Sequence, residues 1–230
     1  MIEQIQKKSN VVISVPHSGL EFNNYKKYFH NNVKLEQDVD HYVNKLFDID
    51  KINCSYIKSH LIRIVTDLNR KKETAFFHWK RNTLNEKIIK KYPEKEDLKY
   101  WDLYYDFLIK MSGKNKLLLD LHSMPSCATK FHLSKNPHQD IERPDICISD
   151  TNKNYKFTKI IADIFRKKFK DVRINDPYFG GNISKQMCSK YKYAIQIEIN
   201  RKLYLDEKTK KMNNNLDITD ILNDIIENFK

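Results

Sequence analysis

The sequence predicts a single α/β domain over residues 1–230, with helices flanking a central, mixed and mostly parallel β-sheet. First, apolar runs rich in Val, Ile and Leu alternate with amphipathic segments of helical length, which is typical of a sheet covered by helices. Second, 230 residues, of which 40% are hydrophobic and 31% charged, are enough to bury one core. No apolar run approaches the roughly 18 residues that a membrane span needs, so we expect no membrane partner.

Seven short apolar runs, several of them rich in β-branched residues, are predicted as strands. They cover residues 11–15, 55–58, 62–66, 117–121, 146–148, 172–174 and 194–199. In the last run, Ile195, Ile197 and Ile199 would face one side of the sheet. The polar side chains between them, among them Glu198, would face the other side, because side chains alternate along a strand.

Six segments are predicted as helices, and they cover residues 40–48, 84–91, 98–111, 154–169, 183–191 and 218–229. In the fourth, apolar residues recur at helical spacing and Asn154 can cap the start. The stretch 126–144 reads as one long loop, a feature that often covers an active site.

The net charge of +12 is spread over every segment, without a concentrated basic stripe. We therefore expect no nucleic-acid partner, although a positive field would favour small anionic substrates. The first residues show no secretion signal. The four cysteines are scattered without a CxxC pair, which favours a reducing cytoplasm and argues against a cysteine-bound zinc.

Two histidines, His17 and His122, each follow or end an apolar run and precede a serine. A catalytic zinc site usually takes three side chains from His, Asp and Glu and leaves one position for water. Two histidines at matching strand ends suggest such a site, and a carboxylate must complete it. Glu21, Asp38 and Asp40 are the candidates, although Asp38 could instead cap the following helix.

Arginines and an asparagine cluster where residues 62–66 end. Arg63, Asn69 and Arg70 together would suit the carboxylate of an acidic substrate, because a guanidinium presents a planar fork of donors. In the alternative, Arg70 pairs with a structural carboxylate such as Asp67.

Glu198 lies within a strand that is otherwise largely apolar. A buried carboxylate is costly unless it is paired or bound to a metal or water, so a general base beside a metal-activated water is one reason to keep it. The alternative is a salt bridge to Arg201 or Arg70.

Taken in order, six motifs resemble the N-formylglutamate amidohydrolase family, a branch of the zinc carboxypeptidase and aspartoacylase-like hydrolases. They are Val15-Pro-His-Ser-Gly19, Asp38-Val-Asp40, Arg63 with Asp67-Leu-Asn-Arg70, Asp120-Leu-His-Ser123, Phe179-Gly-Gly-Asn-Ile183, and Gln196-Ile-Glu198 leading to Leu203-Tyr204. The resemblance implies a zinc-peptidase (phosphorylase/hydrolase-like) architecture and a catalytic domain over the whole chain.

The resemblance also implies roles for single residues. His17, His122 and Asp40 would bind one zinc ion per chain, with Asp40 preferred to Asp38. The wider superfamily usually has its carboxylate ligand three residues after the first histidine, where this chain has Leu20. Glu198 resembles the catalytic glutamate.

The resemblance also implies how the substrate would be bound. Arg63 would polarise the scissile carbonyl, and Asn69 and Arg70 would bind the substrate carboxylate. Lys185 stands where family members commonly have an arginine, and Lys71 stands where they commonly have a proline. A lysine cannot reproduce the bidentate fork of an arginine.

The predicted function is zinc-dependent hydrolysis of the amide of a small, anionic N-acylated acidic amino acid, with N-formylglutamate as a candidate. One alternative is a metallopeptidase or amidase that acts on a peptide or cell-wall fragment. The other is a basic anion-binding or nucleic-acid-binding module without turnover. The sequence leaves the oligomeric state open.

Overall fold

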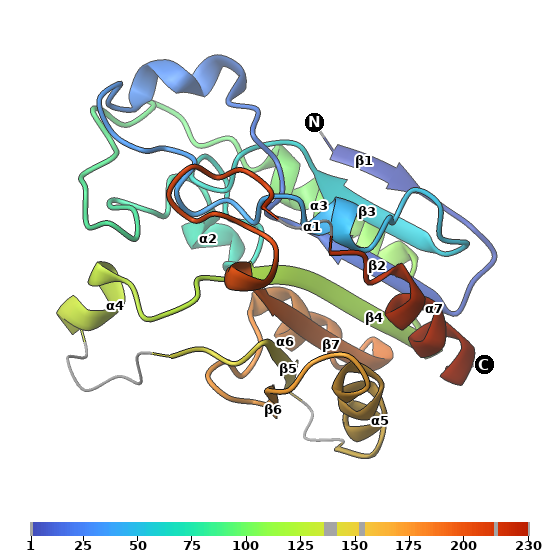
Figure 1. Ribbon diagram of the computed structural model, residues 1–230. Helices are drawn as coiled ribbons and strands as arrows, with labels where there is room; N and C mark the ends of the chain where they lie inside the picture. The colour runs from blue at the N-terminus through green and yellow to red at the C-terminus, as the bar shows by residue number, and fades with distance from the viewer. Residues whose placement is uncertain (1, 136–141, 152–154, 214–215, 230) are drawn as a thin grey trace.

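The computed structural model describes residues 2–135, 142–151, 155–213 and 216–229. Within them the chain forms one seven-stranded sheet in the order β1-β3-β2-β4-β7-β5-β6 (Figure 1). The strands are β1 (Ile2–Ile5), β2 (Val11–Val15), β3 (Ser55–Ser59), β4 (Gly113–Met124), β5 (Ile146–Asp150), β6 (Val172–Ile174) and β7 (Tyr191–Asn200).

Most of the pairings in this sheet are parallel. β3, β2, β4 and β7 are joined in one parallel run, and β5 pairs with β6 in parallel. The antiparallel contacts are β1 with β3 and β5 with β7. The predicted α/β class with a mixed, mostly parallel sheet is therefore confirmed.

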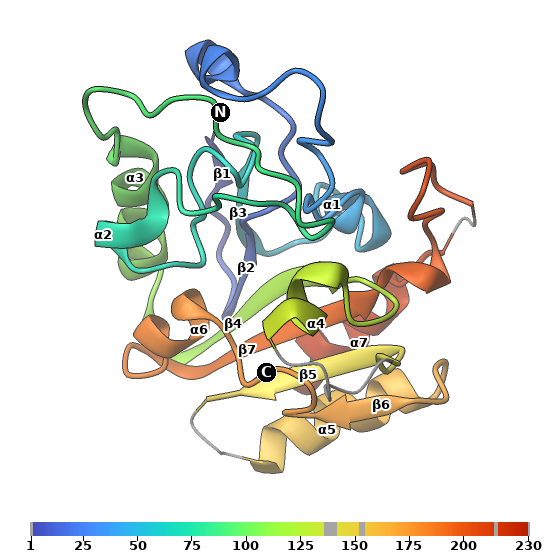
Figure 2. The same ribbon diagram turned by 90° about the vertical axis from the view of Figure 1, so that its left-hand side faces the viewer.

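Helices cover both faces of the sheet. They are α1 (Val43–Leu46), α2 (Lys72–Ala75), α3 (Lys99–Lys110), α4 (Lys130–Lys135), α5 (Tyr155–Arg166), α6 (Asn182–Met187) and α7 (Thr219–Asn228), with 3-10 turns η1 (Asn23–Tyr28) and η2 (Arg201–Leu203). Figure 2 shows α3 and α6 to the left of β2 and β4, with α1 on their right.

The alternation of side chains along the strands explains these two layers. Leu117, Leu119 and Leu121 of β4 pack in one apolar cluster with α1, α5 and α7. Leu118 packs on the opposite face with α3 and α6. In β7 the three isoleucines at 195, 197 and 199 join the first cluster, as predicted, so Glu198 is left on the face of α3 and α6.

Two predicted elements are wrong. Residues 62–66 do not form a strand, because they turn through a hydrogen bond from the Val65 N–H to the Ile62 oxygen. Residues 84–91 do not form a helix, and the Ile88 N–H bonds to the oxygen of Lys80. Apolar side chains of both segments are instead buried in a third cluster beneath the loops. A buried loop segment gives the same apolar sequence pattern as a strand or a helix.

Other predictions differ at their limits. The helix predicted over 183–191 ends at Met187, because Tyr191 already begins β7. β1 was not predicted. The predicted loop at 126–144 contains α4, while its residues 136–141 lie outside the described part, as does the predicted cap Asn154.

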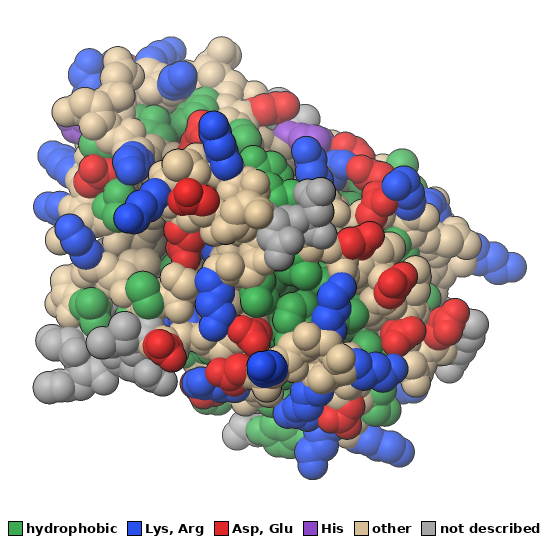
Figure 3. Space-filling model, in the orientation of Figure 1, with side chains coloured by type: hydrophobic (Ala, Val, Ile, Leu, Met, Phe, Trp, Pro, Cys, Tyr) green, Lys and Arg blue, Asp and Glu red, His purple; other side chains and the backbone are tan. Residues whose placement is uncertain are grey.

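Charges of both signs are mixed on the surface. On the face shown in Figure 3, Lys and Arg side chains are interspersed with Asp and Glu side chains. This view therefore gives no basic stripe that would follow a phosphate backbone. Within the described residues, no helix is both long and apolar enough to cross a bilayer.

Candidate active site

Three neighbouring parallel strands bring predicted site residues to one edge of the sheet. β2, β4 and β7 run in the same direction, so their carboxyl ends lie side by side. His17 comes two residues after β2, His122 lies near the end of β4, and Glu198 is the direct partner of His122 on β7. These side chains therefore meet although they are far apart in sequence.

Asp40 reaches the two histidines from the loop before α1. Its N–H donates to the carbonyl oxygen of His17 at 3.0 Å, which fixes its backbone beside the end of β2. Its Oδ2 atom lies 3.5 Å from Nδ1 of His17 and 3.2 Å from Nδ1 of His122. All three side chains are buried. Two imidazole nitrogens and a carboxylate oxygen thus face one point, which is a donor set that zinc accepts.

The outer nitrogen of each imidazole contacts a second carboxylate. Nε2 of His17 lies 2.8 Å from Oδ1 of Asp67, and Nε2 of His122 lies 2.9 Å from Oδ2 of Asp120. A proton on Nε2 leaves the lone pair of Nδ1 free for a metal, and such carboxylates commonly orient metal-binding histidines.

One atom tests whether these residues fit a metal ion. Nδ1 of His17 is buried and has no hydrogen-bond partner anywhere in the part of the chain that is described. A buried polar atom without a partner is costly, and a cation between His17 and Asp40 would satisfy it. His17, His122 and Asp40 therefore fit a metal ion.

Local charges favour a cation at the same point. Burial alone would raise the pKa of Asp40, but the neighbouring His122 and His17 hold that pKa well below its usual value. Burial would lower the pKa of His122, yet the neighbouring Asp120 and Asp40 raise it well above its usual value. Asp40 is therefore an anion, and its charge favours a cation between the two histidines.

Arg201 holds the remaining oxygen of Asp40. Its Nη2 lies 3.0 Å from Oδ1 of Asp40, and its Nε donates to Oγ of Ser123 at 3.0 Å. The side chain of Arg201 is 4% exposed, so this ion pair is buried. The sequence offered Arg201 only as a partner for Glu198. An arginine placed directly after a buried strand was the signal for a buried role, but nothing in the sequence gave its partner.

Glu198 is a buried carboxylate with a raised pKa. Its side chain is buried, and Nε2 of Gln196 donates to its Oε1 at 2.8 Å. Burial raises the pKa of Glu198 to about 7, although His122 lowers it. No described Lys, Arg or His lies within ion-pair distance of it, so the alternative salt bridges to Arg201 and Arg70 are not formed.

Asp67 gathers several donors beside the histidines. Besides His17, it accepts from Nη2 of Arg63 at 3.2 Å and from Nε1 of Trp79 at 2.7 Å. Arg63 also donates to the carbonyl oxygen of Asp38 at 3.1 Å. Burial alone would raise the pKa of Asp67, but Arg63 and His17 hold it well below its usual value. Arg63 is thus fixed on the cavity wall.

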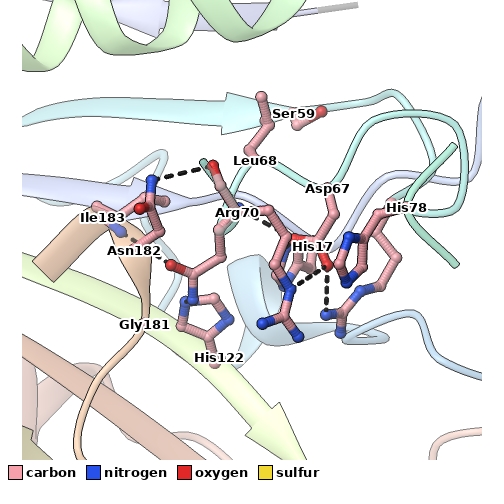
Figure 4. Close-up of polar contacts among 12 residues, drawn as sticks. His17, Ser59, Asp67, Leu68, Arg70, His78, His122, Gly181, Asn182 and Ile183 are labelled. Atoms are coloured by element: carbon pink, nitrogen blue, oxygen red, sulfur yellow. Dashed lines mark hydrogen bonds and ion pairs between the residues drawn. The ribbon is translucent and has the colours of Figure 1, made fainter. Parts of the chain in front are cut away.

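Asn69 and Arg70 are tied to the start of α6. The Ile183 N–H donates to Oδ1 of Asn69, and Nδ2 of Asn182 donates to the oxygen of Arg70, both at 2.9 Å (Figure 4). A Cβ at Gly181 would lie 2.0 Å from Nδ2 of Asn69, so only glycine permits this approach.

The side chain of Arg70 remains accessible. Its Nε lies 3.6 Å from Oδ2 of Asp67, which is the pairing considered as an alternative, but 43% of the side chain is exposed. Lys185, which is exposed on α6, lies on the same cavity.

The other two carboxylates considered as ligands are placed elsewhere. The carboxylate of Asp38 accepts hydrogen bonds from the N–H and hydroxyl of Thr83, and it does not cap α1, which begins at Val43. Glu21 is exposed, and its backbone bonds to the segment around Leu61.

All eight predicted site residues line one cavity of about 350 Å³. They are His17, Asp40, Arg63, Asn69, Arg70, His122, Lys185 and Glu198. Trp79, Tyr178, Phe179 and Arg201 complete parts of the wall. A cavity of this size suits a small molecule.

Comparisons with known proteins agree with this geometry. The sequence model of the N-formylglutamate amidohydrolase family matches residues 9–205. The crystal structure of an N-formylglutamate amidohydrolase from Ralstonia eutropha JMP134 is similar, with a TM-score of 0.77 and 18% identity over 99% of this chain and 95% of that one. A gene product of Agrobacterium tumefaciens gives a TM-score of 0.70 and 14% identity over 99% and 94%. At such identities the likeness shows the fold. No curated protein matches this sequence.

Proposed function

The chain belongs to the N-formylglutamate amidohydrolase family, and we propose that it is a zinc-dependent hydrolase for a small N-acylated acidic amino acid, with N-formylglutamate as the first candidate. The resemblance predicted from its motifs is confirmed, and so is its class as a hydrolase of amide bonds. The zinc, the substrate and the residue roles are the proposal. The observation that supports it most is the buried Nδ1 of His17, which has no hydrogen bond among the described residues and faces Asp40 beside His122.

Zinc would be held by Nδ1 of His17, Nδ1 of His122 and Oδ2 of Asp40, one ion per chain. When bound, such an ion acidifies a water molecule to a pKa of roughly 7 and polarises a carbonyl oxygen. Asp67 and Asp120 keep the imidazole rings in the orientation that this requires. Arg201 holds Asp40 so that one carboxylate oxygen is left for the ion.

Glu198 would move the proton. Its pKa of about 7 lets it accept a proton from the attacking water near neutral pH and return it to the departing nitrogen. Burial beside His122 places it at the metal end of the cavity. The amide from Gln196 fixes one carboxylate oxygen and leaves the other for the water.

Two groups of side chains would orient the substrate. Arg63, held by Asp67 and Asp38, would face the scissile carbonyl and stabilise the charge that develops on its oxygen. Arg70 and Lys185 would bind a substrate carboxylate, with Asn69 beside them. Anions of this kind also suit the positive net charge of the chain.

The four cysteines are unpaired, and we place the enzyme in the cytoplasm, where thiols stay reduced. An alternative activity on a peptide or cell-wall fragment would use the same catalytic residues.

Two measurements test the function. Protein purified without chelator should contain about one zinc per chain and hydrolyse N-formyl-L-glutamate faster than short peptides. Glu198→Gln should keep the zinc and lose at least about a hundredfold in kcat. Protein that takes up no divalent ion, or a Glu198→Gln variant with full turnover, contradicts the proposal.

A further inference from the structure

Trp79 contacts three residues of the cavity at once, and neither its sequence position nor any motif assigned it a role. It lies four residues after α2 and lines the cavity. Its indole N–H donates to Oδ2 of Asp67 at 2.7 Å. The guanidinium carbons of Arg63 and Arg70 lie 5.5 Å and 5.2 Å from its ring centroid. Both distances are within the range of a cation–π contact.

The two arginines depend on Trp79 to different degrees. Arg63 has two further anchors, because Asp67 and the carbonyl oxygen of Asp38 accept its hydrogen bonds at 3.2 Å and 3.1 Å. Among the described residues, the guanidinium of Arg70 has, besides Trp79, only the 3.6 Å contact of its Nε with Asp67, and its side chain is 43% exposed. Removal of the indole would therefore free Arg70 far more than Arg63.

We propose that Trp79 is a positioning residue that fixes Arg70 relative to Arg63, and that it thereby selects substrates by the spacing between their carboxylate and their scissile carbonyl. This inference rests on the proposed function, in which Arg63 faces the carbonyl and Arg70 binds the carboxylate. A rigid separation of two recognition groups favours one spacing in the substrate, whereas a free arginine accepts several.

Two isomeric probes measure this selection. N-formyl-L-glutamate and N-formyl-β-glutamate have equal charge and composition. One carbon separates the nitrogen from the nearest carboxylate in the first isomer, and two carbons separate them in the second. The zinc-loaded parent should prefer one isomer at least tenfold in kcat/KM. Trp79→Leu should bring the ratio close to one through a higher KM for the preferred isomer. Trp79→Phe keeps an aromatic face for Arg70 and should retain most of the preference.

Phe76→Leu is the matched control. Phe76 lies in the same segment and packs on Tyr25 and Phe77, but it does not line the cavity. This variant should keep the parent ratio. If Trp79→Leu slows both isomers equally, or if Phe76→Leu changes the ratio as much, Trp79 is merely structural and the inference is wrong. A parent that hydrolyses both isomers with the same kcat/KM also overturns it.

A binding measurement separates this inference from the proposed function. By calorimetry, L-glutamate should bind the chelator-treated parent roughly tenfold more tightly than it binds Trp79→Leu, with Trp79→Phe close to the parent. If the zinc-loaded parent hydrolyses neither isomer but this loss is observed, the proposed reaction is wrong while the role of Trp79 in holding Arg70 stands. Equal affinity of parent and Trp79→Leu overturns the inference.

Discussion

Nε2 of His122 lies 2.9 Å from Oδ2 of Asp120, a residue two positions earlier on the same strand. Both side chains point to the face of α3, since residues two apart on a strand share a face. Oδ1 of Asp120 accepts from Oγ of Ser14 at 2.7 Å, and Ser14 in turn contacts the hydroxyl of Tyr104 on α3. The motif Asp-x-His thus holds a histidine together with the carboxylate that orients it.

Asp120→Asn should weaken zinc binding by about ten- to a hundredfold. An amide orients the imidazole of His122 less firmly than a carboxylate does and makes it a weaker ligand for the metal. Competition with a chromogenic chelator measures the affinity. Asp163→Asn is the control, since Asp163 is exposed on α5 and its ion pair among the described residues is with Arg166. Equal zinc affinity of Asp120→Asn and the parent would show that Asp120 does not support His122.

Arg201→Met should lower the free energy of unfolding of the metal-free protein by about 3 to 5 kcal/mol, because Asp40 would be left as a buried charge without its guanidinium. Chemical denaturation measures the change. Arg166→Met breaks an exposed pair with Asp163 and should cost less than about 1 kcal/mol. A cost for Arg201→Met as small as that of the control would mean that Asp40 does not need Arg201.

The sequence predicted those parts of the molecule that depend on short, local patterns. Six of the strands follow from apolar runs, and the site residues on them follow from polar residues at the ends of those runs. The strand predicted over residues 62–66 is wrong because their apolar side chains are buried beneath a loop. Burial in a turn gives the same sequence pattern as burial in a sheet.

Partners that come from distant segments could not be predicted. Arg201 and Asp40 are separated by 161 residues, and no local spacing reports their contact. Trp79 follows a stretch that was predicted wrongly, so nothing placed it beside Arg63 and Arg70. The sequence likewise left three carboxylates open as ligands, and only the folded loop before α1 brings Asp40 to the histidines.

Glu198 gives the metal-free protein a defined dependence of stability on pH. Burial raises its pKa from 4.5 to about 7 in the folded state, so the folded protein binds this proton more tightly than the unfolded chain does. The free energy of unfolding should therefore fall as pH rises from about 4.5 to about 7, and this loss is complete above that range. Glu198→Gln removes this decrease, because glutamine does not titrate.

At pH 8, metal-free Glu198→Gln should thus be more stable than the parent by on the order of 3 kcal/mol, while near pH 4 the two should agree. Urea denaturation at both pH values measures the difference. Glu227→Gln, which removes an exposed glutamate on α7, should follow the parent at both. A variant that is no more stable than the parent at pH 8 would contradict a raised pKa for Glu198.

Gly181→Ala should impair substrate binding and leave the metal site intact. The added Cβ would lie 2.0 Å from Nδ2 of Asn69, so Asn69 or the start of α6 must move, and Arg70 is bonded to the same helix through Asn182. A shift of about 1 Å at a substrate-positioning group can cost roughly a hundredfold in kcat/KM. Zinc content should stay at the parent value, because His17, His122 and Asp40 lie on other segments.

Gly113→Ala is the control, since its Cβ would meet nothing closer than a side-chain oxygen of Asn115 at 3.1 Å. If Gly181→Ala retained the parent kcat/KM, the close packing of Asn69 on α6 would have no part in catalysis, whereas loss of zinc from this variant would show that the two halves of the site are not independent.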